Sequence, residues 1–154
     1  MPKETPWLDL KYGLVVGAIV LALVGALRLP TMLAIGSVGF CKKAFGELAG
    51  GRMGVVRMLD WETLTAMGID VGKTYRNLAG ERNRASYQRQ FIEAFARSFR
   101  QSGGRPEAFV RWRIVGEEGD RTIVAADYPA KQRTLLFLVP LEGPRRVMEI
   151  RWAS

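Results

Sequence analysis

Few side chains in this sequence could carry chemistry at neutral pH, because histidine is absent and cysteine occurs once. Histidine is the commonest general base near neutrality and a common metal ligand, so Ser-His-Asp systems, Cys-His systems and the usual zinc sites are excluded within this chain. The phosphate-binding patterns GxxxxGK[ST] and GxGxxG are also missing. The sequence therefore predicts no metal and no cofactor. The groups that remain for acid–base chemistry are Asp60, Asp127, Tyr75, Tyr87 and Tyr128.

The two aspartates have commoner structural roles. Asp60 opens an Asp-Trp-Glu sequence within a segment of helical spacing, where a cap or a backbone hydrogen bond is the usual function of such a residue. Asp127 precedes Tyr128-Pro129 and is typical of a turn. A buried aspartate can still be tuned to act as a general base. A small lyase or isomerase is therefore a third-ranked alternative, and we do not expect an enzyme.

Aromatic side chains form a second constellation, which could bind an apolar ligand. Sites for small molecules are often lined by such residues, and here Tyr87 or Asp60 would stand at a polar edge. In a small domain the same residues more commonly pack the core between helix and sheet, so both interpretations stay open. The candidate pocket residues are Asp60, Trp61, Tyr87, Phe91, Phe95, Trp112 and Trp152.

Arginine dominates the basic residues, and the chain of 154 residues carries a net charge of +8. Such charge favours anionic lipid head groups or an acidic partner. Nucleic acid is not expected, because the basic residues are interspersed and no nucleic-acid-binding motif is present. Alternation around Trp112 places Arg111 and Arg113 on one face of a strand, which fits either a basic binding surface or ordinary solvated arginines. The candidate surface residues are Arg111, Arg113, Arg133, Arg145 and Arg146, with Arg121 nearby.

The run from Tyr12 to Leu27 is sixteen residues long and uncharged, with Lys11 before it and Arg28 after it. As a helix it would measure roughly 24 Å, and the flanking cations could snorkel to the two interfaces of a bilayer. The run predicts a single transmembrane helix over about residues 12–28. A cleaved signal peptide, with small residues at Val24 and Ala26, and a helical hairpin kinked at Pro30 are the alternatives.

This interpretation divides the chain into an N-terminal part, residues 1–40, and one domain over residues 41–154. The first part comprises a polar lead, the transmembrane helix and a connector, with the lipid bilayer as its partner. Basic residues near the ends of the helix favour a cytoplasmic domain. The single cysteine, Cys41, cannot form an internal disulfide and so does not identify the compartment.

Within the domain, helical spacing of apolar residues predicts helices over Cys41–Ala49, Met53–Met67 and Asn83–Gln101, with Gly68 as a helix C-cap. The third is the clearest, because four aromatic residues recur every fourth position. Beyond Pro106 the period changes to two, as expected for strands. The strands lie near 110–114, 122–126, 134–139 and 147–152. We expect an α+β domain in which about three helices pack on one face of a four-stranded antiparallel sheet.

Several segments carry a resemblance to a known superfamily. The sequences FGELAGG (residues 45–51) and VVRMLDWETL (residues 55–64) resemble the first helix, the glycine-containing turn and the second helix of the cystatin-like α+β superfamily named after nuclear transport factor 2. The sequences MLDWE (residues 58–62) and FIEAF (residues 91–95) resemble segments of small bacterial envelope proteins of that superfamily. The last also resembles a helix of Mla-type periplasmic phospholipid carriers. The resemblance covers about residues 41–152. It implies a curved sheet that wraps the long helix and encloses an apolar pocket, in a superfamily of enzymes, carriers and binding modules.

These observations predict a non-enzymatic binding or assembly module, anchored by one helix in a bacterial inner membrane. The resemblance to envelope proteins favours an extracytoplasmic domain, against the charge bias. The partner would be a membrane protein or an apolar ligand. A carrier that holds a lipid or another apolar ligand in its pocket is the alternative function.

Overall fold

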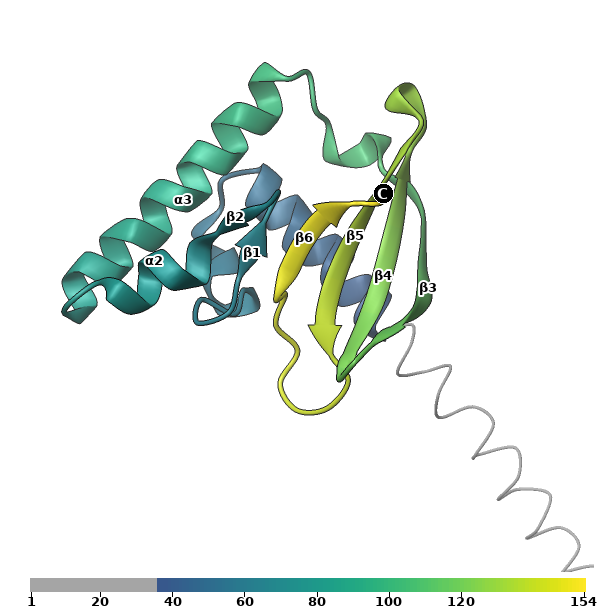
Figure 1. Ribbon diagram of the computed structural model, residues 1–154. Coiled ribbons are helices and arrows are strands. Elements are labelled where there is room, and N and C mark those ends of the chain that lie inside the picture. Colours follow the sequence, from purple (N-terminus) through teal and green to yellow (C-terminus); the bar gives the residue numbers. More distant parts are fainter. Residues whose placement is uncertain (1–35) are drawn as a thin grey trace, which may run out of the picture. The chain divides into compact units, whose positions relative to one another are not determined.

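The computed structural model describes residues 36–154, of which residues 37–154 form one compact unit. Figure 1 shows the order of the elements. Residues 36–49 are helical, and they are followed by η1 (Met53–Met58), β1 (Thr65–Ala66), β2 (Ile69–Asp70), α2 (Val71–Asn77), α3 (Glu81–Gln101), η2 (Pro106–Ala108), β3 (Val110–Glu118), β4 (Arg121–Tyr128), η3 (Pro129–Lys131), β5 (Arg133–Pro140) and β6 (Glu149–Trp152), where η denotes a 3-10 helix.

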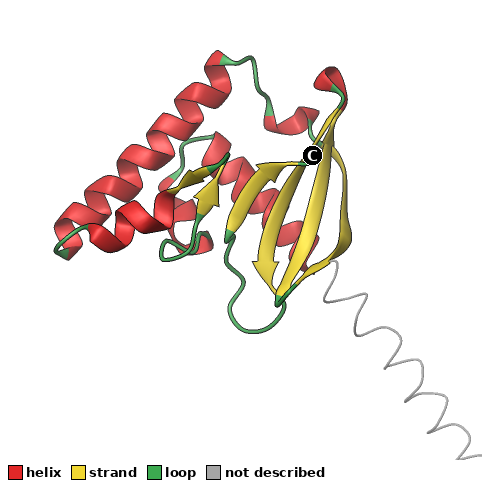
Figure 2. Ribbon diagram, in the orientation of Figure 1, coloured by secondary structure: helices red, strands yellow, loops and turns green. Residues whose placement is uncertain are grey.

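The strands form one six-stranded sheet in the order β2-β1-β6-β5-β4-β3 (Figure 2). Strands β3 to β6 make the expected antiparallel meander. Strand β1 runs parallel to β6, with Thr65 opposite Glu149 and Ala66 opposite Ile150. The predicted four-stranded antiparallel sheet is therefore wrong in strand number and in pairing. The domain is α+β with a mixed six-stranded sheet.

The additional strands could not be recognised by periodicity, because β1 and β2 contain two residues each. They are joined by Met67 and Gly68, which have φ angles of +51° and +82°. Two successive residues with positive φ form the tight turn that best fits the twist of an antiparallel hairpin. Gly68 was predicted to cap a helix, and it instead occupies this hairpin turn.

The predicted helix over Met53–Met67 is also wrong, because helical structure ends with η1 at Met58. From Leu59 onward the backbone bonds to the segment before β6. The N–H of Asp60 donates to the carbonyl of Val147 at 2.9 Å, and the N–H of Val147 donates to the carbonyl of Met58 at 2.8 Å. A backbone that bonds to another segment in this way cannot also complete helical i to i+4 bonds.

Helix α3 confirms the predicted third helix and begins two residues before the expected Asn83. Its four aromatic residues, Tyr87, Phe91, Phe95 and Phe99, are half-buried and pack against the core. Helix α2 was not predicted. It begins where the carboxylate of Asp70 accepts the N–H of Lys73 at 2.9 Å, a typical N-cap contact.

The helix over residues 36–49, rather than α3, crosses the core face of the sheet (Figure 2). Phe45 at its centre is 2% exposed, and its ring lies 5.6 Å from Phe137 of β5 and 6.1 Å from Trp112 of β3. Phe99 of α3 contacts the edge of the same ring at 5.5 Å between centroids. The fold therefore does not match the expectation of a sheet wrapped around the long helix.

The transmembrane helix predicted over residues 12–28 lies outside the described residues, as do the possible cleavage site and Pro30. Among the helices of residues 36–154, none combines the length and the apolar character needed to cross a bilayer. Within the part of the chain that the structure describes, the predicted fold class is corrected to an α+β domain with a mixed six-stranded sheet.

Candidate ligand-binding pocket

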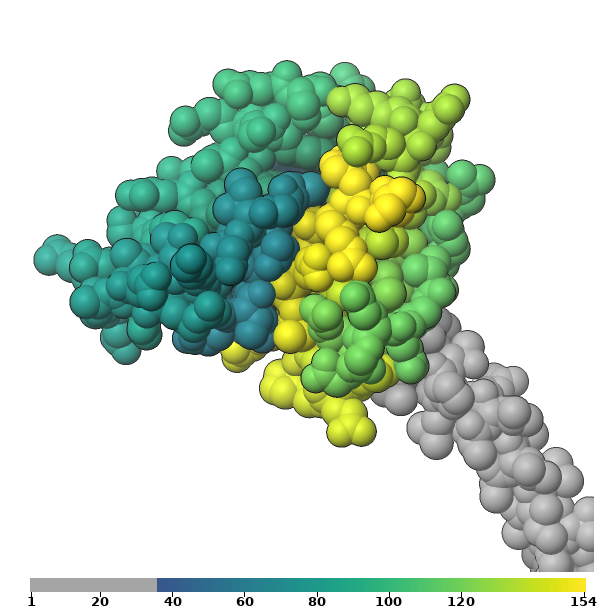
Figure 3. All heavy atoms as spheres, in the orientation of Figure 1, coloured from purple at the N-terminus to yellow at the C-terminus, as the bar shows by residue number. Residues whose placement is uncertain are grey.

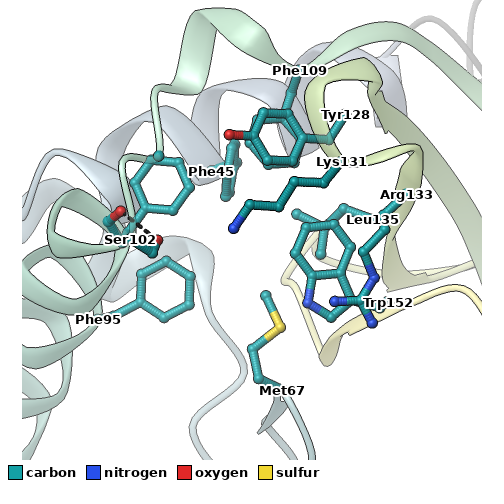
Figure 4. A pocket seen from close by; sticks show the side chains of 12 residues that line it. Phe45, Met67, Phe95, Ser102, Phe109, Tyr128, Lys131, Arg133, Leu135 and Trp152 are labelled. Atoms are coloured by element: carbon teal, nitrogen blue, oxygen red, sulfur yellow. Dashed lines mark hydrogen bonds between the residues drawn. The ribbon is translucent and has the colours of Figure 1, made fainter.

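A partly enclosed cavity of about 230 Å³ lies where the C-terminal end of α3 meets the sheet. Helix 36–49 forms its floor through Phe45, and the β1–β2 turn contributes Met67. Figure 3 shows the segments around η3, β6 and the end of α3 meeting on one face of the molecule. The lining residues are Phe45, Met67, Phe95, Phe99, Ser102, Gly104, Phe109, Tyr128, Lys131, Arg133, Leu135 and Trp152 (Figure 4).

The helical wall of the cavity is held by the way α3 ends. The carbonyl of Phe99 accepts the hydroxyl of Ser102 at 2.8 Å and the N–H of Gly104 at 2.9 Å. Gly103 has a φ of +77°, the left-handed conformation that commonly ends helices. A Cβ atom at Gly104 would lie 2.5 Å from the Phe99 ring, so a larger residue here would have to displace that ring.

The sheet side of the cavity is a packed group of aromatic rings. Phe109 stacks on Tyr128 at 4.7 Å between centroids and on Trp152 at 6.3 Å. The same ring contacts Phe45 edge-on at 4.8 Å. Trp152 pairs with Leu135 across β5 and β6, which brings the last strand to the cavity. This wall is closely packed and mostly apolar, as is common for small-molecule sites.

Two cations stand beside this apolar wall, and both come from the connection between β4 and β5. Lys131 ends η3, Gln132 takes a left-handed φ of +51°, and Arg133 begins β5. The Arg133 guanidinium lies 4.8 Å from the centre of the Trp152 ring, a cation–π contact. Figure 4 shows the Lys131 side chain reaching in among the aromatic residues. None of the lining residues is acidic.

The structure brings two of the predicted pocket residues, Phe95 and Trp152, to this cavity and places the others elsewhere. The Trp61 ring packs between Tyr75 and Phe91, and its indole N–H donates to the carbonyl of Val56 at 2.8 Å. Tyr87 packs against the core.

Trp112 and Asp60 likewise have structural contacts. Trp112 stacks on Phe137 at 5.3 Å and donates its indole N–H to the carbonyl of Phe109 at 3.0 Å. Asp60 accepts the backbone N–H of Glu62 at 3.2 Å, which is a local turn contact. The two side chains therefore serve packing and turn formation.

The remaining lining residues were not among the predicted pocket residues. Phe99 belongs to the aromatic periodicity of α3, which could have identified it. Arg133 was assigned to the basic surface. Phe45, Phe109, Leu135 and Lys131 become neighbours only when helix 36–49 crosses the sheet, and no local pattern could indicate that. The acid–base candidates are dispersed as well, with Tyr128 at the cavity and Asp127 on the other face of β4.

The predicted basic surface is divided between the two ends of the sheet. Arg133 begins β5, whereas Arg145 and Arg146 lie in the exposed loop after its other end. Arg111 and Arg113 both bind Asp127, at 2.8 Å from Nε and 3.0 Å from Nη1 respectively to Oδ2. Their charge is thus partly compensated within the domain.

A second group of ion pairs covers the outer face of the sheet at the far end. Arg151 contacts Glu118 and Glu149, each at 3.0 Å, and Arg121 lies 3.5 Å from Glu149. Glu118 and Glu149 form ion pairs with Arg121 and Arg151, so positive and negative charges are mixed on this face and it is not uniformly basic. The exposed pair between Arg151 and Glu118 contributes little to stability, as is usual for ion pairs in contact with solvent.

Asp127 is the most strongly held carboxylate among these groups. Its Oδ1 accepts the hydroxyl of Thr134 at 2.9 Å while Oδ2 accepts the two arginines. The Thr134 hydrogen bond and the Arg113 contact lower the pKa of Asp127 below its ordinary value of 3.8, against a smaller opposing effect of desolvation. The ionised form is therefore favoured in the folded state.

This arrangement predicts a pH dependence of stability. Because the folded-state pKa is lowered, the contribution of Asp127 is present above its unfolded pKa and is lost as pH falls through the lower folded value. We expect wild type to lose more stability than Asp127→Asn as pH falls from 5 to below 3.8, with urea unfolding at each pH as the measurement. A stability difference between the two proteins that does not change over this range would contradict the assignment.

Two further features bear on reactivity. Burial raises the pKa of the Cys41 thiol to about 12, against a smaller opposing effect of Arg145. The thiol thus stays protonated at neutral pH and packs in the core, away from nucleophilic chemistry. Within residues 36–154 no cluster of three or more His, Cys, Asp or Glu side chains could hold a metal ion.

Comparison of the chain with protein-family models, with curated proteins and with solved structures found no match. The cavity, its aromatic wall and its two cations are therefore the observations on which a function can be argued.

Proposed function

We propose that this protein is a non-enzymatic binding module that holds a small apolar ligand in the cavity beside α3. The observation that carries the proposal is the composition of the lining, in which aromatic and other apolar side chains from seven parts of the chain converge on one partly enclosed space. Apolar cavities with a few polar groups at the edge are the usual form of ligand sites.

The size of the cavity limits the ligand. Its volume of about 230 Å³ lies below the roughly 300–1,000 Å³ typical of pockets for drug-sized molecules. A short alkyl chain or a single ring system fits this limit. No carboxylate lines the cavity, and the nearby Asp127 is bound by Thr134 and two arginines, so acid–base catalysis on a bound ligand has no support here.

The function ranked first from the sequence was a binding or assembly module, which could dock a partner through Arg111 and Arg113. The structure favours this function less, because both guanidinium groups already bind Asp127. A partner would have to compete with contacts that the domain makes internally.

The proposal can be tested by labelling the full chain with a photoreactive eight-carbon alcohol that carries a diazirine. Peptide mapping should place the label on residues of the cavity, such as Phe95 or Trp152. Ser102→Trp, which puts an indole at the cavity edge, should reduce that label by about tenfold, because the added ring occupies the ligand's space. The control is Ser98→Trp, one turn earlier in α3, exposed and outside the lining.

Labelling that is absent from the cavity peptides of wild type would refute the proposed function. Equal labelling of the two tryptophan variants and wild type would also count against it, provided that circular dichroism shows all three proteins to be folded. Mapping the modified peptides is essential, because the apolar run over residues 12–27 could take up the probe independently of the cavity.

A further inference from the structure

We infer that the ligand of this cavity is a short single-chain amphiphile with an anionic head group, which Lys131 and Arg133 bind at the cavity edge. The inference rests on the proposed function and adds the chemical class of the ligand. The evidence for it is that all charged groups in the cavity lining are positive, while most of the other lining residues are apolar. Two cations and no carboxylate belong to the lining.

The two cations have no anionic partner within the part of the chain that the structure describes. Ion pairs of the described residues join arginines to Glu47, Glu118, Asp127 and Glu149, and none involves Lys131 or Arg133. The Arg133 guanidinium rests on the face of Trp152, which leaves its N–H groups unbonded to any residue of 36–154. Both residues are exposed overall, although they line the cavity.

Their position suits a head group at the opening of the cavity. Arg133 lines both the apolar cavity and a neighbouring open groove of about 430 Å³, so it marks the border between the apolar interior and solvent. The carboxylate of Asp127 lies in that groove, but Arg111 and Arg113 already bind it. A carboxylate or phosphate at this border could accept N–H donors from Lys131 and Arg133 together.

The apolar part of the ligand is limited by volume. A water molecule occupies about 30 Å³ in the liquid and a methylene group is of similar size, so 230 Å³ holds roughly eight such groups. An eight-carbon chain would lie against Phe95, Phe99 and Phe45 with its charged end toward Lys131. The alternative is that the methylene stem of Lys131 merely covers the apolar wall while its amine stays in water.

Competition against the photoreactive eight-carbon alcohol, scored on the cavity peptides of the full chain, separates these cases. Octanoate and octyl phosphate test the two anionic head groups, 1-octanol is the neutral analogue, and octylamine is the cationic one. We expect either anion to displace the probe at about tenfold lower concentration than 1-octanol, and octylamine to be weaker than 1-octanol. The advantage of the anions should shrink as salt rises from 50 to 500 mM.

Lys131→Met keeps the apolar stem and removes the charge. In this variant and in Arg133→Met, the ratio between octanoate and 1-octanol should fall from about ten to below about three, and the double variant should show a ratio near one. The matched controls are Lys73→Met in α2 and Arg89→Met in α3, both exposed and outside the lining. They should retain the wild-type ratio.

Two results would overturn the inference. If 1-octanol competes as well as both anions in wild type, the cavity binds neutral ligands and the proposed function survives without the anionic head group. If Lys131→Met and Arg133→Met retain the full ratio, the cations only cover the apolar wall. An absence of any label in the cavity peptides is a distinct result, because it refutes the proposed function itself.

Discussion

Phe45→Ala should lower the free energy of unfolding by about 3–5 kcal/mol, the range seen when a buried phenylalanine is truncated. Phe45 is 2% exposed and contacts rings from four different parts of the fold, including Trp112 of β3. Its centroid lies 5.5 Å from Phe99 of α3, 4.8 Å from Phe109 and 5.6 Å from Phe137 of β5. Removing it leaves a cavity among residues that cannot all move inward together, because each belongs to a different element.

This loss would be a large fraction of the 5–15 kcal/mol by which most domains are stable. Chemical denaturation followed by circular dichroism measures it. The matched control is Gly46→Ala in the next position of the same helix, where an added Cβ meets nothing within 4 Å. That change should stabilise the helix by up to about 1 kcal/mol. A destabilisation by Phe45→Ala of less than about 1 kcal/mol would mean that helix 36–49 does not pack on the sheet as described.

Gly72→Ala should destabilise the domain by about 1–3 kcal/mol, the usual range for adding a group to a packed site. A Cβ at this position would lie 2.6 Å from the carbonyl oxygen of Glu62 and 3.1 Å from the backbone nitrogen of Leu64. The N–H of Gly72 also donates to the carbonyl of Leu64 at 2.9 Å. The atoms in the way are backbone, so a rotamer change cannot relieve the contact, and α2 must move from the segment before β1.

Urea unfolding of Gly72→Ala and Gly39→Ala side by side gives the comparison. Gly39 lies in helix 36–49, where an added Cβ meets nothing within 4 Å, so the same chemical change should be neutral or stabilising there. If the two variants had the same stability, the close approach of α2 to residues 62–64 would be refuted. If Gly72→Ala alone lost stability, the position of α2 beside the β1–β2 hairpin would be supported.

Much of the secondary structure could be predicted from local pattern. The recurrence of Tyr87, Phe91, Phe95 and Phe99 every fourth residue identified α3, because a helix with one apolar face has that period. Alternation over residues 110–114 and 147–152 identified two strands of the meander, since successive side chains of a strand face opposite sides. The turn residues between 116 and 120 and the apolar run over 134–139 identified the other two. The chemical exclusions follow from composition alone, because a chain without histidine cannot build histidine-dependent sites.

Only the tertiary structure decided the sheet and the pocket. Strands β1 and β2 are too short to show a period, and the parallel pairing of β1 with β6 joins residues more than eighty positions apart. Whether an aromatic residue packs in the core or lines a cavity depends on where helices and strands cross. Trp61 and Trp112 pack in or against the core, whereas Phe95 and Trp152 line the cavity. Lys131 is not marked by any local sequence pattern. It lies beside the aromatic wall because η3 and the left-handed Gln132 set the backbone direction between β4 and β5, and the position of that connection depends on the whole sheet.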